Sequence, residues 1–225
     1  MTHQHPVLPA VEIEPQHRDA DAAIIWLHGL GANGHDFEPI VPELRLPSSI
    51  AARFIFPHAP EIPVTVNGGM RMPAWYDIKA MDLERVVDEA QLLESARRTT
   101  DLIEREIARG IDSRRIIVAG FSQGGAVAYH AALTFEKPLA GLMALSTYLA
   151  TPDITRPSDA NRRLPVRIYH GSADPMVPMM LGERAAVQLR EMGLEPSWQS
   201  YPMGHEVCLP QIRDIAGFIT QCLNA

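Results

Sequence analysis

A serine between two glycines is the most distinctive chemical feature of the sequence. Ser122 lies in Gly-Phe-Ser-Gln-Gly at 120–124, after residues 115–119 that predict a buried strand and before residues 125–135 that predict a helix. A serine in such a tight strand-to-helix turn projects its hydroxyl above the sheet edge, and the flanking glycines avoid collisions with strand and helix. The amide of Gln123, at the helix start, then points toward an oxyanion formed on an attacked carbonyl. The pattern predicts Ser122 as a nucleophile and Gln123 as an oxyanion donor.

A serine hydroxyl needs a base, and a nucleophile of this kind is followed along the chain first by an acid and then by a histidine. Of the nine histidines, six precede Ser122 and His130 lies on the helix that leaves it, so their position excludes them. His170 ends a strand, where packing is its expected role. His205 follows the final predicted strand directly and precedes the last helix. It is the predicted base.

The acid is expected in a loop that can meet the histidine loop. Asp174 follows the strand at 166–169, one strand upstream of the strand that leads to His205. We therefore predict Asp174 as the carboxylate that orients the histidine. Asp153 and Asp159 follow the preceding strand and stay open as alternatives.

A glycine-rich loop at 29–34 matches the G-x-G-x-x-G pattern of dinucleotide sites. That interpretation requires an acidic residue about 20 positions later, at the end of the next strand, to bind the ribose. The next predicted strand, Arg-Phe-Ile-Phe-Pro-His at 53–58, carries none. The loop instead stands where a second oxyanion donor is expected after an early strand, and we assign that donor to the amide of Leu30.

Short β-branched runs alternate with helical patterns along the chain, which predicts one α/β domain over 1–225 with a mainly parallel sheet and helices on both faces. Strands are expected at 7–13, 23–27, 53–56, 115–119, 139–145, 166–169 and 197–201. Helices are expected at 85–108, 125–135, 179–192 and 210–223. The first helix should bury an apolar stripe formed by Val86, Leu93, Ala96, Thr100, Ile103 and Ile107. Prolines and an Asn-Gly-Gly turn make 61–75 a long loop or a short hairpin.

Composition narrows the class of protein. The net charge of −7, without a local basic patch, argues against nucleic acid as a partner. The most apolar run, 139–145, is far shorter than the ~20 residues that cross a bilayer, and the first residues do not resemble a secretory signal. A helix at 210–223 would hold Cys208 and Cys222 roughly 20 Å apart, which excludes a disulfide between them. These features favour a cytoplasmic protein with free thiols.

The chain resembles the family of bacterial carboxylesterases, acyl-protein thioesterases and lysophospholipases. The matching stretches run in order through nearly the whole chain: Leu-His-Gly-Leu-Gly at 27–31, Phe-Pro-His-Ala-Pro at 56–60, Val-Asn-Gly-Gly-Met-Arg-Met-Pro-Ala-Trp-Tyr-Asp at 66–77, Gly-Phe-Ser-Gln-Gly-Gly at 120–125, His-Gly-Ser-Ala-Asp-Pro at 170–175 and Tyr-Pro-Met-Gly-His at 201–205. The resemblance implies an α/β-hydrolase fold, the triad Ser122, Asp174 and His205, oxyanion amides at Leu30 and Gln123, and no metal or organic cofactor. Two departures, Gly-Ser-Ala-Asp at 171–174 and Thr147 where glycine is common, leave the substrate preference open.

The expected reaction is hydrolysis of a carboxylic ester or thioester, with acyl-protein thioesterase or lysophospholipase as the alternative main activity and serine peptidase as a less favoured one. The substrate is expected to be a small-molecule or lipid acyl ester or thioester, or an acylated protein, and a homo-oligomer stays open. A silent hydrolase-fold binding module is disfavoured because all three triad residues are present. A cluster of methionines with one tryptophan predicts a groove for the acyl chain, because methionine side chains adapt to flexible apolar chains. Packing in the core is the alternative role for these residues. The proposed groove residues are Met70, Met72, Trp75, Met176, Met179 and Met180.

Overall fold

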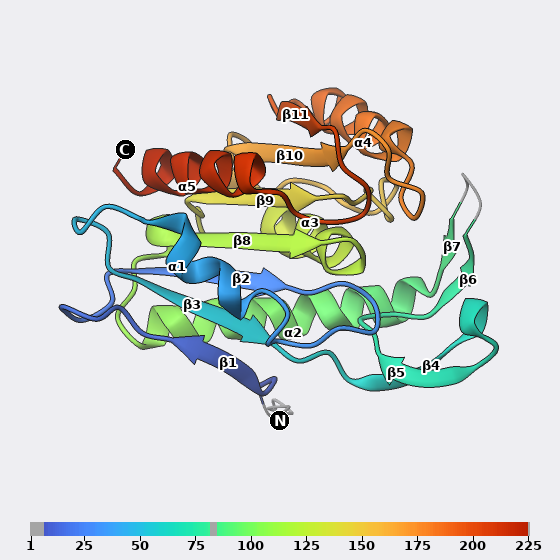
Figure 1. Cartoon of the computed structure of the whole chain (residues 1–225), viewed down its shortest axis with the longest axis horizontal. Helices are drawn as coiled ribbons and strands as arrows, with labels where there is room; N and C mark the ends of the chain where they lie inside the picture. Colours follow the sequence, from blue (N-terminus) through green and yellow to red (C-terminus); the bar gives the residue numbers. More distant parts are fainter. Residues whose placement is uncertain (1–6, 82–84, 225) are drawn as a thin grey trace.

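A seven-stranded sheet forms the centre of the molecule in the computed structural model, which describes residues 7–81 and 85–224 (Figure 1). The strand order is β1-β3-β2-β8-β9-β10-β11. β1 runs antiparallel to β3, and every other neighbouring pair in the sheet is parallel. The strands are β1 (Ala10–Ile13), β2 (Ala22–Leu27), β3 (Ala52–Pro57), β8 (Ile116–Phe121), β9 (Gly141–Leu145), β10 (Val166–Gly171) and β11 (Ser197–Tyr201). All seven expected strands are present, although the first begins three residues later than predicted.

In the described part of the chain, five α-helices cover both faces of this sheet: α1 (Val41–Leu44), α2 (Glu89–Ala108), α3 (Gln123–Thr134), α4 (Met179–Glu191) and α5 (Leu209–Leu223). Side chains of β2 alternate between two cores, with Leu27 packed among residues of α2, α3 and α4, and Trp26 packed among residues of α1 and α5. Figure 1 shows α1 and α5 in front of the sheet and α2 behind it. Because both faces are covered, every residue of β2 is buried and the strand sequence is continuously apolar. The mainly parallel α/β arrangement is therefore confirmed.

The predicted apolar stripe of the longest helix is partly right: Ala96 and Ile103 are buried and Ile107 packs against the core, but its first two residues are exposed. α2 begins at Glu89, where the carboxylate of Asp88 accepts a hydrogen bond from the amide of Gln91, and Val86 lies in the preceding strand with its side chain exposed. Leu93 is also 37% exposed. The buried face also includes two hydroxyl residues, Ser95 and Thr99. Both hydroxyls donate to backbone carbonyls, so their burial leaves no donor unpaired. Because these buried residues are polar, a search for apolar residues does not find this part of the buried face.

The segment 61–75 forms a short hairpin, one of the two expected alternatives. Strands β4 (Glu61–Val64) and β5 (Met70–Pro73) pair antiparallel around a single 3-10 turn, η2 (Thr65–Asn67). A second small hairpin consists of β6 (Ile78–Ala80) and β7 (Val86–Val87), which the sequence pattern did not indicate. Both hairpins lie on the side toward which the parallel strands point (Figure 1). The remaining 3-10 turns are η1 (Glu38–Ile40), η3 (Ser113–Arg115) and η4 (Asp159–Asn161).

Two further sequence expectations concern the cysteines and the membrane. Cys208 precedes α5 and Cys222 lies in its last turn, and both are free thiols, as expected. Within residues 7–81 and 85–224, none of the helices combines the length and apolarity that a membrane crossing requires.

Candidate active site

Ser122 occupies a strained turn between β8 and α3. Its backbone has φ 53° and ψ −120°, a conformation that residues with a side chain rarely adopt. A Cβ atom on Gly120 would lie 2.3 Å from the carbonyl oxygen of Gly124, and one on Gly124 would lie 2.5 Å from the carbonyl oxygen of His28. The two glycines are therefore required by the close approach of strand, helix and the loop after β2. This is the turn that the Gly-x-Ser-x-Gly pattern predicts.

Hydrogen bonds from the neighbouring strand end hold this turn in place. The amide of Ser122 donates to the carbonyl of Leu145 at 2.9 Å. The hydroxyl of Thr147 donates to the carbonyl of Ser122 at 2.6 Å, and Thr147 is fully buried. Thr147, one of the two departures from the family pattern, therefore contacts the backbone of the predicted nucleophile directly.

His205 lies between Ser122 and Asp174, and the structure brings the three side chains together. The Nε2 atom of His205 is 3.0 Å from Oγ of Ser122, and its Nδ1 is 2.7 Å from Oδ2 of Asp174. The imidazole also packs on the ring of Phe121, with 4.6 Å between centroids. Ser122, Asp174 and His205 follow the carboxyl ends of β8, β10 and β11, respectively. In the sheet, β9 separates β8 from β10, and β10 pairs directly with β11. Such an arrangement can pass a proton from the serine to the imidazole while the carboxylate stabilises the imidazolium.

The carboxylate of Asp174 is buried but well supplied with donors. Its Oδ1 accepts hydrogen bonds from the amides of Met176 at 2.9 Å and Val177 at 2.8 Å, while Oδ2 accepts from His205. Burial alone would raise the pKa of Asp174. The hydrogen bonds from His205, Val177 and Met176 outweigh that effect and hold the pKa below its ordinary value. The carboxylate is therefore ionised at neutral pH.

The two predicted oxyanion amides come from different elements: Leu30 lies in the loop after β2, and Gln123 is the first residue of α3. Leu30 and Gln123 line the same cavity as Ser122 and His205. Among the described residues, neither of these two amides donates a backbone hydrogen bond in the turns and loops. Both are thus available to a ligand oxygen.

The frame around these two amides was not foreseen from the sequence. The side chain of Gln123 is buried, accepts from the amide of Trp75 and donates to the carbonyl of Tyr76, both at 2.7 Å. The indole of Trp75 donates to the carbonyl of His28 at 2.8 Å, and the amide of Gly31 donates to Pro73 at 2.8 Å. The end of β5 and the residues after it therefore connect the loop after β2 to the start of α3. All of these residues lie within the matched stretches 27–31, 66–77 and 120–125, but the match alone does not indicate that they bond to one another.

The cavity beside the triad has a volume of about 280 Å³. Of the proposed groove residues, Met176 lines it, whereas Trp75 is buried outside its described lining and Met70 is 64% exposed at the start of β5. Met72, Met179 and Met180 also lie outside its described lining. Besides the amides and triad residues already named, the walls contain Gly29, Ala32, Asp36, Ile78, Met81, Arg85, Phe121, Tyr148 and Val177. Most of these were missed because they come from short hairpins and strand ends without a periodic pattern.

The alternative acids and histidines lie elsewhere. Asp159 is exposed and pairs with Arg162, and Asp153 lines a different cavity. His130 contacts the hydroxyl of Thr155, and His170 is fully buried, in keeping with the packing role expected for it. His205 is the histidine that contacts the hydroxyl of Ser122.

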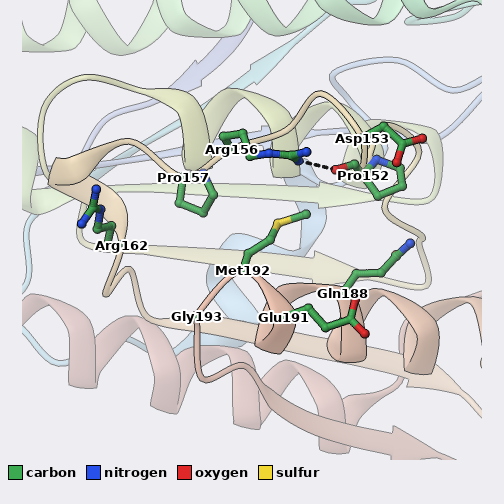
Figure 2. A pocket seen from close by; sticks show the side chains of 9 residues that line it. All are labelled: Pro152, Asp153, Arg156, Pro157, Arg162, Gln188, Glu191, Met192 and Gly193. Atoms are coloured by element: carbon green, nitrogen blue, oxygen red, sulfur yellow. Dashed lines mark hydrogen bonds between the residues drawn. The ribbon is translucent and has the colours of Figure 1, made fainter.

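A larger cavity, of about 690 Å³, lies between the loop 152–162 and the end of α4 (Figure 2). Its described lining has charges of both signs, from Asp153, Arg156, Arg162 and Glu191, and includes no serine, cysteine or histidine. In the parts of the chain that the structure describes, no cluster of three or more histidine, cysteine or acidic side chains is suited to holding a metal ion. Of these two cavities, only the smaller one is lined by a serine and a histidine that could perform covalent chemistry.

Comparison with known proteins identifies the family. The family model described as phospholipase/carboxylesterase matches residues 8–223. An acyl-protein thioesterase 1 of Neurospora crassa is 41% identical over 213 residues, covering 90% of this chain and 87% of that protein. The crystal structure of Arabidopsis thaliana SOBER1 superposes with a TM-score of 0.84 at 30% identity, covering 90% of this chain and 99% of that one. Zea mays acyl-protein thioesterase 2 gives the same TM-score at 26% identity, covering 96% and 99%. The chain therefore belongs to the phospholipase/carboxylesterase family of the α/β-hydrolase fold and is a serine hydrolase.

Proposed function

We propose that this enzyme hydrolyses carboxylic esters or thioesters of acyl substrates through a covalent acyl-enzyme on Ser122, with His205 as general base and acid and Asp174 as its orienting carboxylate. The contact between Nε2 of His205 and Oγ of Ser122, at 3.0 Å, is the main support for this proposal. It lies within the range over which a base can take the proton of the attacking hydroxyl.

In the first half of the reaction, Oγ of Ser122 attacks the acyl carbonyl while Nε2 of His205 takes its proton. Asp174 accepts the hydrogen bond from Nδ1, so the lone pair of the neutral imidazole stays on Nε2, and the carboxylate stabilises the imidazolium that forms. The amides of Leu30 and Gln123 donate to the oxyanion. His205 then protonates the leaving alcohol or thiol, and the bond between carbonyl carbon and leaving group breaks.

In the second half, water replaces the serine hydroxyl as nucleophile. His205 takes a proton from that water, the resulting tetrahedral intermediate is held by the same two amides, and Ser122 leaves with the proton from His205. The acid product and the free enzyme result. None of these steps distinguishes an alcohol from a thiol as leaving group.

The walls of the cavity favour an apolar acyl group. Ile78, Met81, Met176 and Val177 supply apolar surface next to Ser122. We propose that the acyl chain lies along these residues, a revision of the groove expected from the sequence in which only Met176 is kept. Relatives named acyl-protein thioesterase 1 support an acylated protein as one candidate substrate, and the family description supports a lysophospholipid as another. We also propose that 1–225 is a single domain that acts in the cytoplasm.

A panel of matched substrates tests this proposal. Acyl esters, the corresponding thioesters, lysophospholipids and amides with the same acyl group should be assayed with the wild-type enzyme. We expect turnover of the esters and thioesters with little turnover of the amides. Faster hydrolysis of amides than of esters would contradict the proposal and favour a peptidase.

A further inference from the structure

His170 is a buried histidine that the proposed mechanism does not use. It lies near the end of β10, has no solvent exposure, and its ring stacks on Trp198 with 5.8 Å between centroids. Its Nε2 is 2.8 Å from the carbonyl oxygen of Val177. Because a carbonyl can only accept, Nε2 must carry the hydrogen and donate it. Burial lowers the pKa of His170 despite the favourable bond to Val177, so the ring is neutral at working pH.

The peptide groups of Val177 connect this histidine to the acid of the triad. The carbonyl of Val177 accepts from His170, while its amide donates to Oδ1 of Asp174 at 2.8 Å. The same Nε2 of His170 lies 3.8 Å from Oδ2 of Asp174, the oxygen that accepts from His205. The loop 172–178, which carries Asp174 and is called the acid loop here, is therefore held at Val177 by two contacts. The carbonyl of Val177 binds His170 of β10, and its amide binds the carboxylate of Asp174.

We infer that His170 is a positioning residue for Asp174: by holding the carbonyl of Val177, it fixes the loop that presents the carboxylate to His205. The inference rests on the proposed function, because it assigns His170 an effect that acts only through the triad.

Close packing around His170 restricts the movement of its imidazole ring. A Cβ atom on Gly182 of α4 would lie 2.4 Å from Nδ1 of His170 and 3.0 Å from the indole of Trp198. Glycine at 182 therefore leaves just enough room for the imidazole. Nδ1 has no hydrogen-bond partner among the described residues, so Nε2 is the ring atom that makes the polar contact. Losing this single donor should allow the acid loop to move.

The principal test is His170→Phe, which keeps an aromatic ring but removes the donor. We expect the folded variant to have a kcat lower by roughly tenfold with little change in KM, which is less than the ~10⁴-fold loss from removing the carboxylate itself. His170→Gln, whose amide nitrogen can take the place of Nε2, should recover most of the loss.

A double-mutant cycle distinguishes positioning from general destabilisation. In the Asp174→Asn background, His170→Phe should cause no further loss of kcat, because the carboxylate that it positions is already absent. An equal loss in both backgrounds would mean that His170 acts independently of Asp174 and would overturn the inference.

Gly182→Ala provides a second perturbation that keeps His170 itself. The added methyl group displaces the imidazole, so kcat should fall, and this loss should also vanish in the Asp174→Asn background. Gly217→Ala in α5 is the matched control, since a Cβ atom there meets nothing within 4 Å, and it should leave kcat unchanged. This variant keeps the test decisive even where His170→Phe does not fold.

The outcomes separate this inference from the proposed function. A damaging Asp174→Asn together with a silent Gly182→Ala and a silent or additive His170→Phe would overturn only the role of His170. A silent Asp174→Asn would overturn the triad and the inference with it.

Discussion

Asp174 and His205, 31 positions apart in the chain, are joined by a hydrogen bond of 2.7 Å between Oδ2 and Nδ1. The parallel strands β10 and β11 make this contact possible, because they are neighbours in the sheet and their carboxyl ends carry the two loops to the same edge. Asp153 and Asp159 lie instead in the loop before β10, where both are exposed.

We predict that Asp174→Asn leaves a folded enzyme whose kcat falls by a factor on the order of 10⁴, because the imidazole loses its orienting carboxylate and adopts the wrong tautomer. Steady-state kinetics with a short-chain ester measures this effect. Asp153→Asn and Asp159→Asn serve as controls and should cost little. The assignment of the acid would be wrong if either control were as damaging as predicted for Asp174→Asn while Asp174→Asn were nearly silent.

Thr147→Val should lower both stability and kcat. The substitution removes the hydroxyl that donates to the carbonyl of Ser122 at 2.6 Å, and a hydrogen bond of this kind contributes about 1 kcal/mol to the free energy of unfolding. Thr99→Val is the matched control, since Thr99 is equally buried and donates to the carbonyl of Ser95 within α2. It should lose comparable stability without a change in kcat. Equal effects of the two variants on kcat would show that Thr147 has no special influence on the nucleophile.

The contacts among Ser122, His205 and Asp174 could be predicted because the loops after parallel strands of one sheet meet at the same edge. The side chains of the groove could not, because their direction depends on contacts between distant segments. Trp75 illustrates the difference, since its amide and indole bind Gln123 and His28 rather than facing the cavity. The buried face of α2 was predicted only in part for a related reason: Ala96 and Ile103 are buried as expected, but Ser95 is buried as well because its hydroxyl donates to the carbonyl of Trp75, in another segment.

Acyl chain length should influence kcat/KM if the cavity beside Ser122 receives the acyl group. Each methylene that becomes buried supplies up to ~0.8 kcal/mol, or about fourfold, until the 280 Å³ cavity is filled. Met176→Ala should weaken this dependence, whereas Met180→Ala, a neighbouring exposed residue outside the described lining, should not. Chains from two to eight carbons, assayed below the micelle threshold, provide the measurement. A flat response would place the acyl group elsewhere.

Acid should destabilise the protein partly through Asp174. The pKa of Asp174 is lowered in the folded state, so the unfolded state binds more protons. The resulting stability is present above the ordinary pKa of about 4 and is lost as pH falls through the folded value. Unfolding in urea between pH 6 and pH 2 should show a smaller pH dependence for Asp174→Asn than for the wild type.

Glu94→Gln is the control for this experiment. Hydrogen bonds from Arg97 and Arg98 lower the pKa of Glu94 to about 2, but its side chain is 40% exposed and solvent screens the pair. Its effect on the pH dependence should be small. A larger effect from Glu94→Gln than from Asp174→Asn would contradict the explanation given for the buried carboxylate.

Covalent labelling with a fluorophosphonate probe tests the central claim most directly, because such a probe reacts only with an activated serine. We predict that the wild-type enzyme is labelled at Ser122 and loses all esterase activity in proportion, and that folded Ser122→Ala shows neither labelling nor turnover. Labelling or turnover that persists in Ser122→Ala would place the nucleophile at another residue and contradict the account.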